Sequence, residues 1–167
     1  MKLPKICIVE VNVGIAANGR DTHVSLACQK VCVEMLLTLC ERGGFAMDED
    51  GLVFDEYNSG YFHFDVEPGV GDLFFKWVND VQWDESLCRR ESITPHASRT
   101  FAEFPSDPAL AKFDRSDRKY AALARKCGRA AAVFNAADSD WKHHEEALNR
   151  HGVRVVNLCP ADLKEAT

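Results

Sequence analysis

Short apolar runs alternate with segments of helical periodicity along this chain, and this alternation limits the fold classes it can adopt. The runs are apolar throughout rather than alternately polar, as expected of strands covered on both faces. Predicted strands lie at residues 5–13, 45–47, 92–96, 130–134 and 153–158. Predicted helices lie at residues 25–42, 52–58, 72–83, 115–127 and 141–150. We therefore expect an α/β fold with three α/β/α layers around a central, mostly parallel sheet.

The length and composition are those of one globular domain. The 167 residues fall within the usual size of a single domain and contain no linker, internal repeat or low-complexity tract. The 46% apolar and 28% charged residues exclude disordered, collagen-like and coiled-coil chains. No apolar run approaches the ~20 residues of a membrane helix, and no signal-peptide pattern opens the chain. We expect one domain over residues 1–167, located in the cytoplasm and not in a membrane.

The net charge limits the partners that the protein can bind, and the cysteine pattern indicates the state of its thiols. Lys and Arg total 20 against 26 Asp and Glu, a net charge of −6, so a nucleic-acid partner requires a local basic patch or a divalent cation. Cys28 and Cys32 lie one helical turn apart, but the seven cysteines are odd in number and include no C-x-x-C pair. This pattern favours reduced, buried thiols in a cytosol over a disulfide framework or structural zinc.

Acidic side chains recur where predicted strands give way to helices. They are Glu10, Asp55, Glu56, Asp114, Asp117, Asp138 and Asp140. In open α/β sheets, sites form beyond the carboxyl ends of the strands, where these carboxylates would converge and raise one another's pKa. A Mg²⁺ or Mn²⁺ ion relieves that repulsion and can activate water against a phosphodiester. Each acid alone is equally typical of a helix cap or turn, so the recurrence carries the metal hypothesis.

Four segments of the chain resemble the motifs of the PIN-domain nucleases. They are IVEVNV at 8–13, LVFDEY at 52–57, FDRSDRKYAALA at 113–124 and VFNAADSDW at 133–141. Each segment is short, but their order and their placement at strand and helix ends match the family. The resemblance implies a parallel sheet between helices. It also implies a Mg²⁺- or Mn²⁺-dependent endonuclease, with RNA favoured over DNA.

The resemblance also assigns roles to individual residues. The catalytic acids would be Glu10, Glu56, Asp117 and Asp138. The metal ligands would be Glu10, Asp117 and Asp138, with Asp140 in support. For the second acid, Asp55 and Glu34 remain alternatives to Glu56. Asn12 would orient Glu10 or a metal-bound water beside the nucleic acid.

One position departs from the family pattern. Glu10 stands where the family usually has Asp, and the extra methylene moves the carboxylate outward by ~1.5 Å. The alternative hypothesis is therefore a catalytically degenerate PIN-like binding module. A third, weaker alternative is a Toprim-like nuclease, in which Glu10 pairs with the Asp138-Ser139-Asp140 segment. That alternative leaves the Asp117 helix unexplained.

Basic residues cluster on the predicted helix at 115–127. Residues seven apart share a helix face, so we expect a basic strip that contacts phosphates beside the acids. The candidate nucleic-acid-contacting residues are Asn12, Arg118, Lys119 and Arg125. A solvated helix face is the simpler alternative. By resemblance, the protein could be a toxin or defence component, with a cognate antitoxin or other inhibitor protein as partner, and could form a homodimer.

Overall fold

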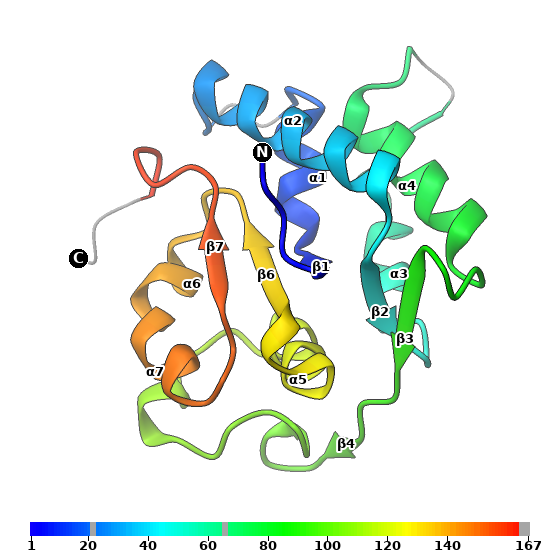
Figure 1. Cartoon of the computed structure of the whole chain (residues 1–167). Coiled ribbons are helices and arrows are strands. Elements are labelled where there is room, and N and C mark those ends of the chain that lie inside the picture. The colour runs from blue at the N-terminus through cyan, green and yellow to red at the C-terminus, as the bar shows by residue number, and fades with distance from the viewer. Residues whose placement is uncertain (21–22, 65–66, 164–167) are drawn as a thin grey trace.

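The computed structural model describes residues 1–20, 23–64 and 67–163. Within these ranges, five strands form one parallel sheet in the order β3-β2-β1-β6-β7 (Figure 1). The strands are β1 (Ile6–Val9), β2 (Phe45–Asp48), β3 (Cys88–Glu91), β6 (Ala131–Asn135) and β7 (Val155–Asn157). Because every pair in this sheet is parallel, the carboxyl ends of all five strands lie along the same edge.

Helices flank the sheet in the expected three-layer α/β/α arrangement. The helices of the described residues are α1 (Val11–Ala17), α2 (Leu26–Arg42), α3 (Leu52–Tyr57), α4 (Val70–Val81), α5 (Arg118–Cys127), α6 (Ser139–His143) and α7 (Glu145–Arg150). Helices α1, α2 and α4 pack against one another, whereas α5 packs across β1, β2 and β6 and touches α3. Helices α6 and α7 lie beside β7 (Figure 1). A small antiparallel pair, β4 (Pro95–His96) and β5 (Thr100–Phe101), lies outside this sheet.

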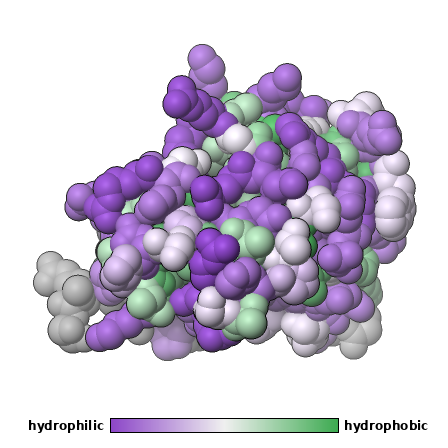
Figure 2. Space-filling model, turned by 90° about the horizontal axis from the view of Figure 1, so that it is seen from below, coloured by the Kyte–Doolittle hydropathy of each residue, from purple (hydrophilic) through white to green (hydrophobic). Residues whose placement is uncertain are grey.

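The apolar strands fill a single core. All four residues of β1 and all five of β6 are buried, as expected of central strands with helices on both faces. The buried hydrophobic side chains form one connected cluster. On the face shown in Figure 2, hydrophilic residues cover most of the surface and hydrophobic ones form small separate patches. Among the described residues, no helix is both long enough and apolar enough to cross a membrane.

Three predicted elements were wrong in detail. The first strand ends at Val9 rather than at residue 13, because the Glu10 carboxylate accepts the Asn12 amide at 3.0 Å and starts α1. Of the strand expected at 92–96, Pro95–His96 forms β4 of the small antiparallel pair, and the edge strand of the main sheet lies instead at Cys88–Glu91, where polar side chains are tolerated. The single helix expected at 141–150 is broken at His144 into α6 and α7.

The expectation that all cysteines are reduced was wrong for one pair. Cys28 in the first turn of α2 and Cys159 after β7 form a disulfide, with their Cα atoms 5.1 Å apart. The contact joins residues separated by 131 positions, so no local spacing could signal it. The remaining five thiols are free, namely those of Cys7, Cys32, Cys40, Cys88 and Cys127.

Candidate functional site

The candidate site lies at the carboxyl edge of the sheet, where β1 and β6 end side by side. The strand register pairs Val9 with Phe134, and the Glu10 amide donates to the Phe134 carbonyl at 3.0 Å. This contact brings the residue that follows β1 against the loop that follows β6. A hollow of about 300 Å³ opens there and is lined by Glu10 and Asp138 on these two connections. His23 and Asp162 contribute further walls.

Glu10 is a buried carboxyl group in an acidic environment. Its side chain is 4% exposed, and burial is the main cause that raises its pKa well above the ordinary value. The charges of Asp117, Glu56 and Asp138 raise it further, whereas the hydrogen bond from the Asn12 amide lowers it. All four predicted catalytic acids therefore lie close enough to interact. The geometry favours a proton or a cation on this group.

Asp117 is a second buried carboxyl group of the cluster. It is buried at the start of α5, and burial, followed by the charges of Asp138, Asp114 and Glu56, raises its pKa to about 7. Lys119 opposes the shift only in part. Among the described residues, the hydrogen bond found at this carboxylate comes from the Ser116 hydroxyl at 3.4 Å. Such a carboxylate is poorly stabilised as an anion without an additional positive charge.

Glu56 is the best-compensated acid of the cluster. Its Oε2 lies 2.9 Å from the Lys119 Nζ and accepts a short hydrogen bond from the Tyr120 hydroxyl. Helix α3 holds it there because the Asp48 carboxylate accepts the amides of Leu52 and Val53 at the start of that helix.

The two alternative second acids lie elsewhere. Asp55 is exposed, on the same short helix as Glu56. Glu34 is exposed on α2 and pairs with the N-terminal ammonium at 2.8 Å. The charge of Glu56 is among the causes that raise the pKa of both Glu10 and Asp117. Of the three, Glu56 is thus the acid that the fold brings to the cluster.

Asn12 and Asn135 connect the strand ends. The Asn12 amide nitrogen donates to Asn135 Oδ1 at 2.7 Å, and its oxygen accepts the Ala136 amide at 2.9 Å. The Asn135 amide donates to the Asp138 carbonyl and to Asn157 Oδ1, both at 2.8 Å. Asn12 therefore holds the β6–α6 loop, rather than presenting its side chain to a nucleic acid. Asn135 was not among the predicted site residues, although its position directly after the predicted strand 130–134 was a usable signal.

Asp138 and Asp140 have different environments. Asp138 is half-buried and accepts the Asp140 amide at 2.8 Å, which starts α6. The Asp140 carboxylate accepts the Asp114 amide at 2.8 Å and lies 3.1 Å from His144 Nδ1. Asp140 thus ties the segment before α5 to α6, a supporting position. His144 was not among the predicted site residues; its i,i+4 spacing from Asp140 was the signal.

The expected basic strip does not form on the surface of α5. Arg118 is buried, and its guanidinium donates to the carbonyls of Ala111 and Phe113 at 3.0 and 3.1 Å. Lys119 is buried against Glu56. Arg118 turns inward because the segment before α5 folds over that helix, and Lys119 does so because α3 brings Glu56 against it. Arg125 is exposed, and its guanidinium donates to the Glu103 carbonyl at 2.6 Å.

The donor set suits a hard cation with several waters. In the described part of the chain, no three carboxylates place oxygen atoms that all lie within 4.8 Å of one another. A cation among these acids would thus be held by one or two carboxylates and completed by water, which is the usual coordination of Mg²⁺. The residues present fit Mg²⁺ or Mn²⁺ in that form.

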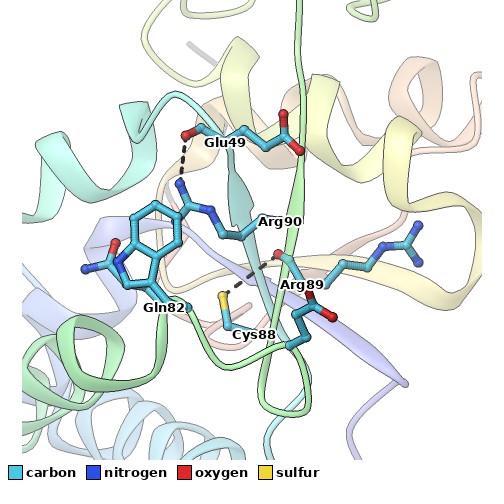
Figure 3. A pocket seen from close by; sticks show the side chains of 7 residues that line it. Glu49, Gln82, Cys88, Arg89 and Arg90 are labelled. Atoms are coloured by element: carbon cyan, nitrogen blue, oxygen red, sulfur yellow. Dashed lines mark hydrogen bonds between the residues drawn. The ribbon is translucent and has the colours of Figure 1, made fainter.

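A larger hollow of about 590 Å³ lies along the edge strand β3 (Figure 3). There the Arg90 guanidinium lies 4.0 Å from the centre of the exposed Trp83 ring and donates to the Glu49 carbonyl at 2.7 Å. Arg89 pairs with Glu91. The lining of this hollow mixes the two arginines with Glu49 and Glu85, so it lacks the excess of acids found at the carboxyl edge of the sheet.

Comparisons with known proteins leave the site to be interpreted from its geometry. No protein-family model, curated protein or solved structure matches the chain.

Proposed function

We propose that the protein is a metal-dependent endonuclease that hydrolyses phosphodiester bonds. The observation that carries the proposal is the meeting of the β1 and β6 ends, where the Glu10 amide donates to the Phe134 carbonyl at 3.0 Å and a hollow is lined by Glu10 and Asp138. The buried Asp117 carboxyl group, whose pKa is raised by burial and by Asp138 among other acids, adds to this acidic surrounding. A divalent cation supplies the positive charge that this cluster lacks. The preference for RNA over DNA rests on the resemblance of the four motifs to the PIN-domain nucleases.

Each residue has a distinct role in this proposal. Asp117 and Asp138 hold the cation from α5 and from the loop after β6, with Glu10 beside them. The cation, when bound, polarises a water and neutralises charge on the scissile phosphate. Lys119 holds the Glu56 carboxylate at 2.9 Å, and Asn12 and Asn135 fix the loop that carries Asp138. Asp140 holds the segment before α5 through the Asp114 amide.

A binding module is the second candidate function, and two contacts favour it. The Glu10 carboxylate is used to cap α1, and the Glu56 carboxylate is paired with Lys119 and Tyr120. Glu56 is therefore less available to a cation than Asp117, and Glu10 is engaged at the start of a helix, as Asp138 is at the start of α6. A chain whose acids are engaged in this way would keep the fold and contact a nucleic acid or protein without cutting.

The resemblance also suggests a cellular setting. In this proposal the nuclease acts in the cytoplasm as a toxin or defence component, and a cognate antitoxin or another inhibitor protein restrains it. Its test is co-purification of such a protein with the tagged native chain and loss of cleavage in the complex.

Cleavage of single-stranded RNA and DNA with Mg²⁺ or Mn²⁺ tests the proposed activity. The native chain should cut, and Asp138→Asn should lower the rate at least ~10²-fold. The matched control is Asp80→Asn, which should cut at the native rate. Asp80 is an exposed acid on α4 that pairs with Lys76. Activity that appears only in Glu10→Asp would support the binding module. Equal cutting by Asp138→Asn and the native chain would overturn the site assignment.

A further inference from the structure

Three buried sulfur atoms meet where the start of α2 approaches the segment after β7. Cys28 and Cys32 lie four residues apart on one face of α2, and Cys159 joins them from the end of the sheet. Their side chains are at most 4% exposed. The three Sγ atoms all lie within 4.8 Å of one another, with Cys32 and Cys159 separated by 4.0 Å.

The separation of Cys32 from Cys159 is that of two thiolates on one metal ion, whereas Cys28 and Cys159 are covalently bonded. Thiolates bound to a tetrahedral Zn²⁺ at ~2.3 Å lie ~3.8 Å from one another, close to the separation of Cys32 and Cys159. Soft sulfur ligands select Zn²⁺ over the hard Mg²⁺ and Mn²⁺ ions. The disulfide between Cys28 and Cys159 blocks the site, because it removes two of the three thiolates.

A water would complete a four-coordinate ion at the three sulfurs. Among the described residues, no carboxylate oxygen lies within 4.8 Å of all three sulfur atoms. Asp162 Oδ2 instead accepts both hydrogen bonds from Ser25, at 2.7 and 2.8 Å.

We propose that the chain, once its Cys28–Cys159 disulfide is reduced, binds one Zn²⁺ through the thiolates of Cys28, Cys32 and Cys159. A small dithiol reductant converts the disulfide to two thiols and is itself oxidised to a cyclic disulfide. One Zn²⁺ then replaces the protons of three thiols and releases three H⁺. The three cysteines are not among the acids of the candidate nuclease site, so the zinc proposal stands whether or not the protein is a nuclease.

Metal uptake by the two redox forms tests this site. After reduction and anaerobic removal of the reductant, the native chain should take up one Zn²⁺ in competition with a colorimetric chelator. With Co²⁺ it should show a sulfur-to-cobalt charge-transfer band, which carboxylate ligands cannot produce. The disulfide-bonded chain should show neither the uptake nor the band.

Single substitutions identify the ligands. Cys32→Ser should lower Zn²⁺ affinity at least ~10²-fold and weaken the charge-transfer band of the Co²⁺ form. Its oxidised form retains the Cys28–Cys159 bond, so circular dichroism of that form verifies the fold. Cys40→Ser, two turns further along α2 and outside the sulfur cluster, should bind as the native chain does. Failure of the reduced native chain to bind Zn²⁺ would overturn the proposal. So would unchanged binding by Cys32→Ser, or equal loss in Cys40→Ser.

Discussion

The Nζ of Lys119 lies 2.9 Å from the Oε2 of Glu56, within the group of carboxylates at the carboxyl edge of the sheet. The same ammonium donates to the Ser116 carbonyl at 2.5 Å, so it is fixed between α3 and the start of α5. It compensates one acid of the cluster and lowers the pKa of Asp117 only partly. The remaining acids therefore keep an excess of negative charge that favours a cation.

Lys119→Met should destabilise the metal-free chain by about 2 kcal/mol, because it leaves Glu56 partly buried without its partner. Added Mg²⁺ should restore part of the lost stability. Urea unfolding with and without Mg²⁺ measures both effects. Lys76→Met, which breaks the exposed pair with Asp80, should cost less than ~1 kcal/mol. Equal losses in the two variants would refute a special role for Lys119.

The raised pKa of Asp117 predicts how stability varies with pH. The folded chain keeps this proton up to about pH 7, whereas the unfolded chain loses it near the ordinary value of 3.8. The folded state thus binds more protons in this window, and stability falls as pH rises, by at most ~1.4 kcal/mol per pH unit for one group. Asp117→Asn should flatten the difference between pH 4 and pH 7 in metal-free urea titrations. An unchanged slope would contradict the burial and repulsion described for this carboxyl.

Asn12→Ala should destabilise the fold by ~1–3 kcal/mol, because two buried hydrogen bonds are lost. The Oδ1 atom of Asn135 loses the group that donates to it, and the Ala136 amide loses the oxygen that accepts from it. Asn79→Ala, at an exposed position on α4, should change stability by less than ~0.5 kcal/mol. Thermal and urea unfolding measure the difference. If Asn12→Ala unfolds like the native chain, the two asparagines do not hold the β6–α6 loop.

Variants of Arg118 and Arg125 should show which of these arginines stabilises the fold and which contacts nucleic acid. Arg118→Met should cost ~2–3 kcal/mol of stability, since its guanidinium donates to buried carbonyls and lies 4.6 Å from the centre of the Phe104 ring. Arg125→Ala should change stability little but weaken salt-dependent binding of single-stranded RNA. Fluorescence anisotropy at two salt concentrations measures that binding. The opposite pattern would restore Arg118 as a phosphate contact.

The sequence predicted the layers of the fold for identifiable reasons, and it led us to expect the acids at one edge of the sheet. The buried strands at Ile6–Val9 and Ala131–Asn135 are uniformly apolar, and α2 has a clear start at Ser25 and a stop at Gly43. Acids that directly follow the strands of a parallel sheet lie along the same edge of that sheet. Their order along the chain was therefore sufficient to expect Glu10 near Asp138.

Other features depended on contacts that no local pattern encodes. The edge strand at Cys88–Glu91 has a polar sequence that resembles a loop. Whether Lys119 faces water or Glu56 depends on where α3 packs, which helical periodicity does not reveal. The Cys28–Cys159 disulfide joins distant segments, and an odd number of cysteines does not exclude one pair.

Direct measurement of Mn²⁺ binding to the disulfide-bonded chain tests the central claim that the acidic cluster is a cation site. Oxidised protein excludes the sulfur cluster from the measurement, and Mn²⁺ prefers oxygen ligands. Calorimetry or electron paramagnetic resonance at pH 8 should detect at least one bound Mn²⁺ in the native chain. The double variant Asp117→Asn/Asp138→Asn should bind at least ~10-fold more weakly, with an unchanged circular dichroism spectrum. Equal binding by the two proteins, or none by the native chain at millimolar Mn²⁺, would contradict the account.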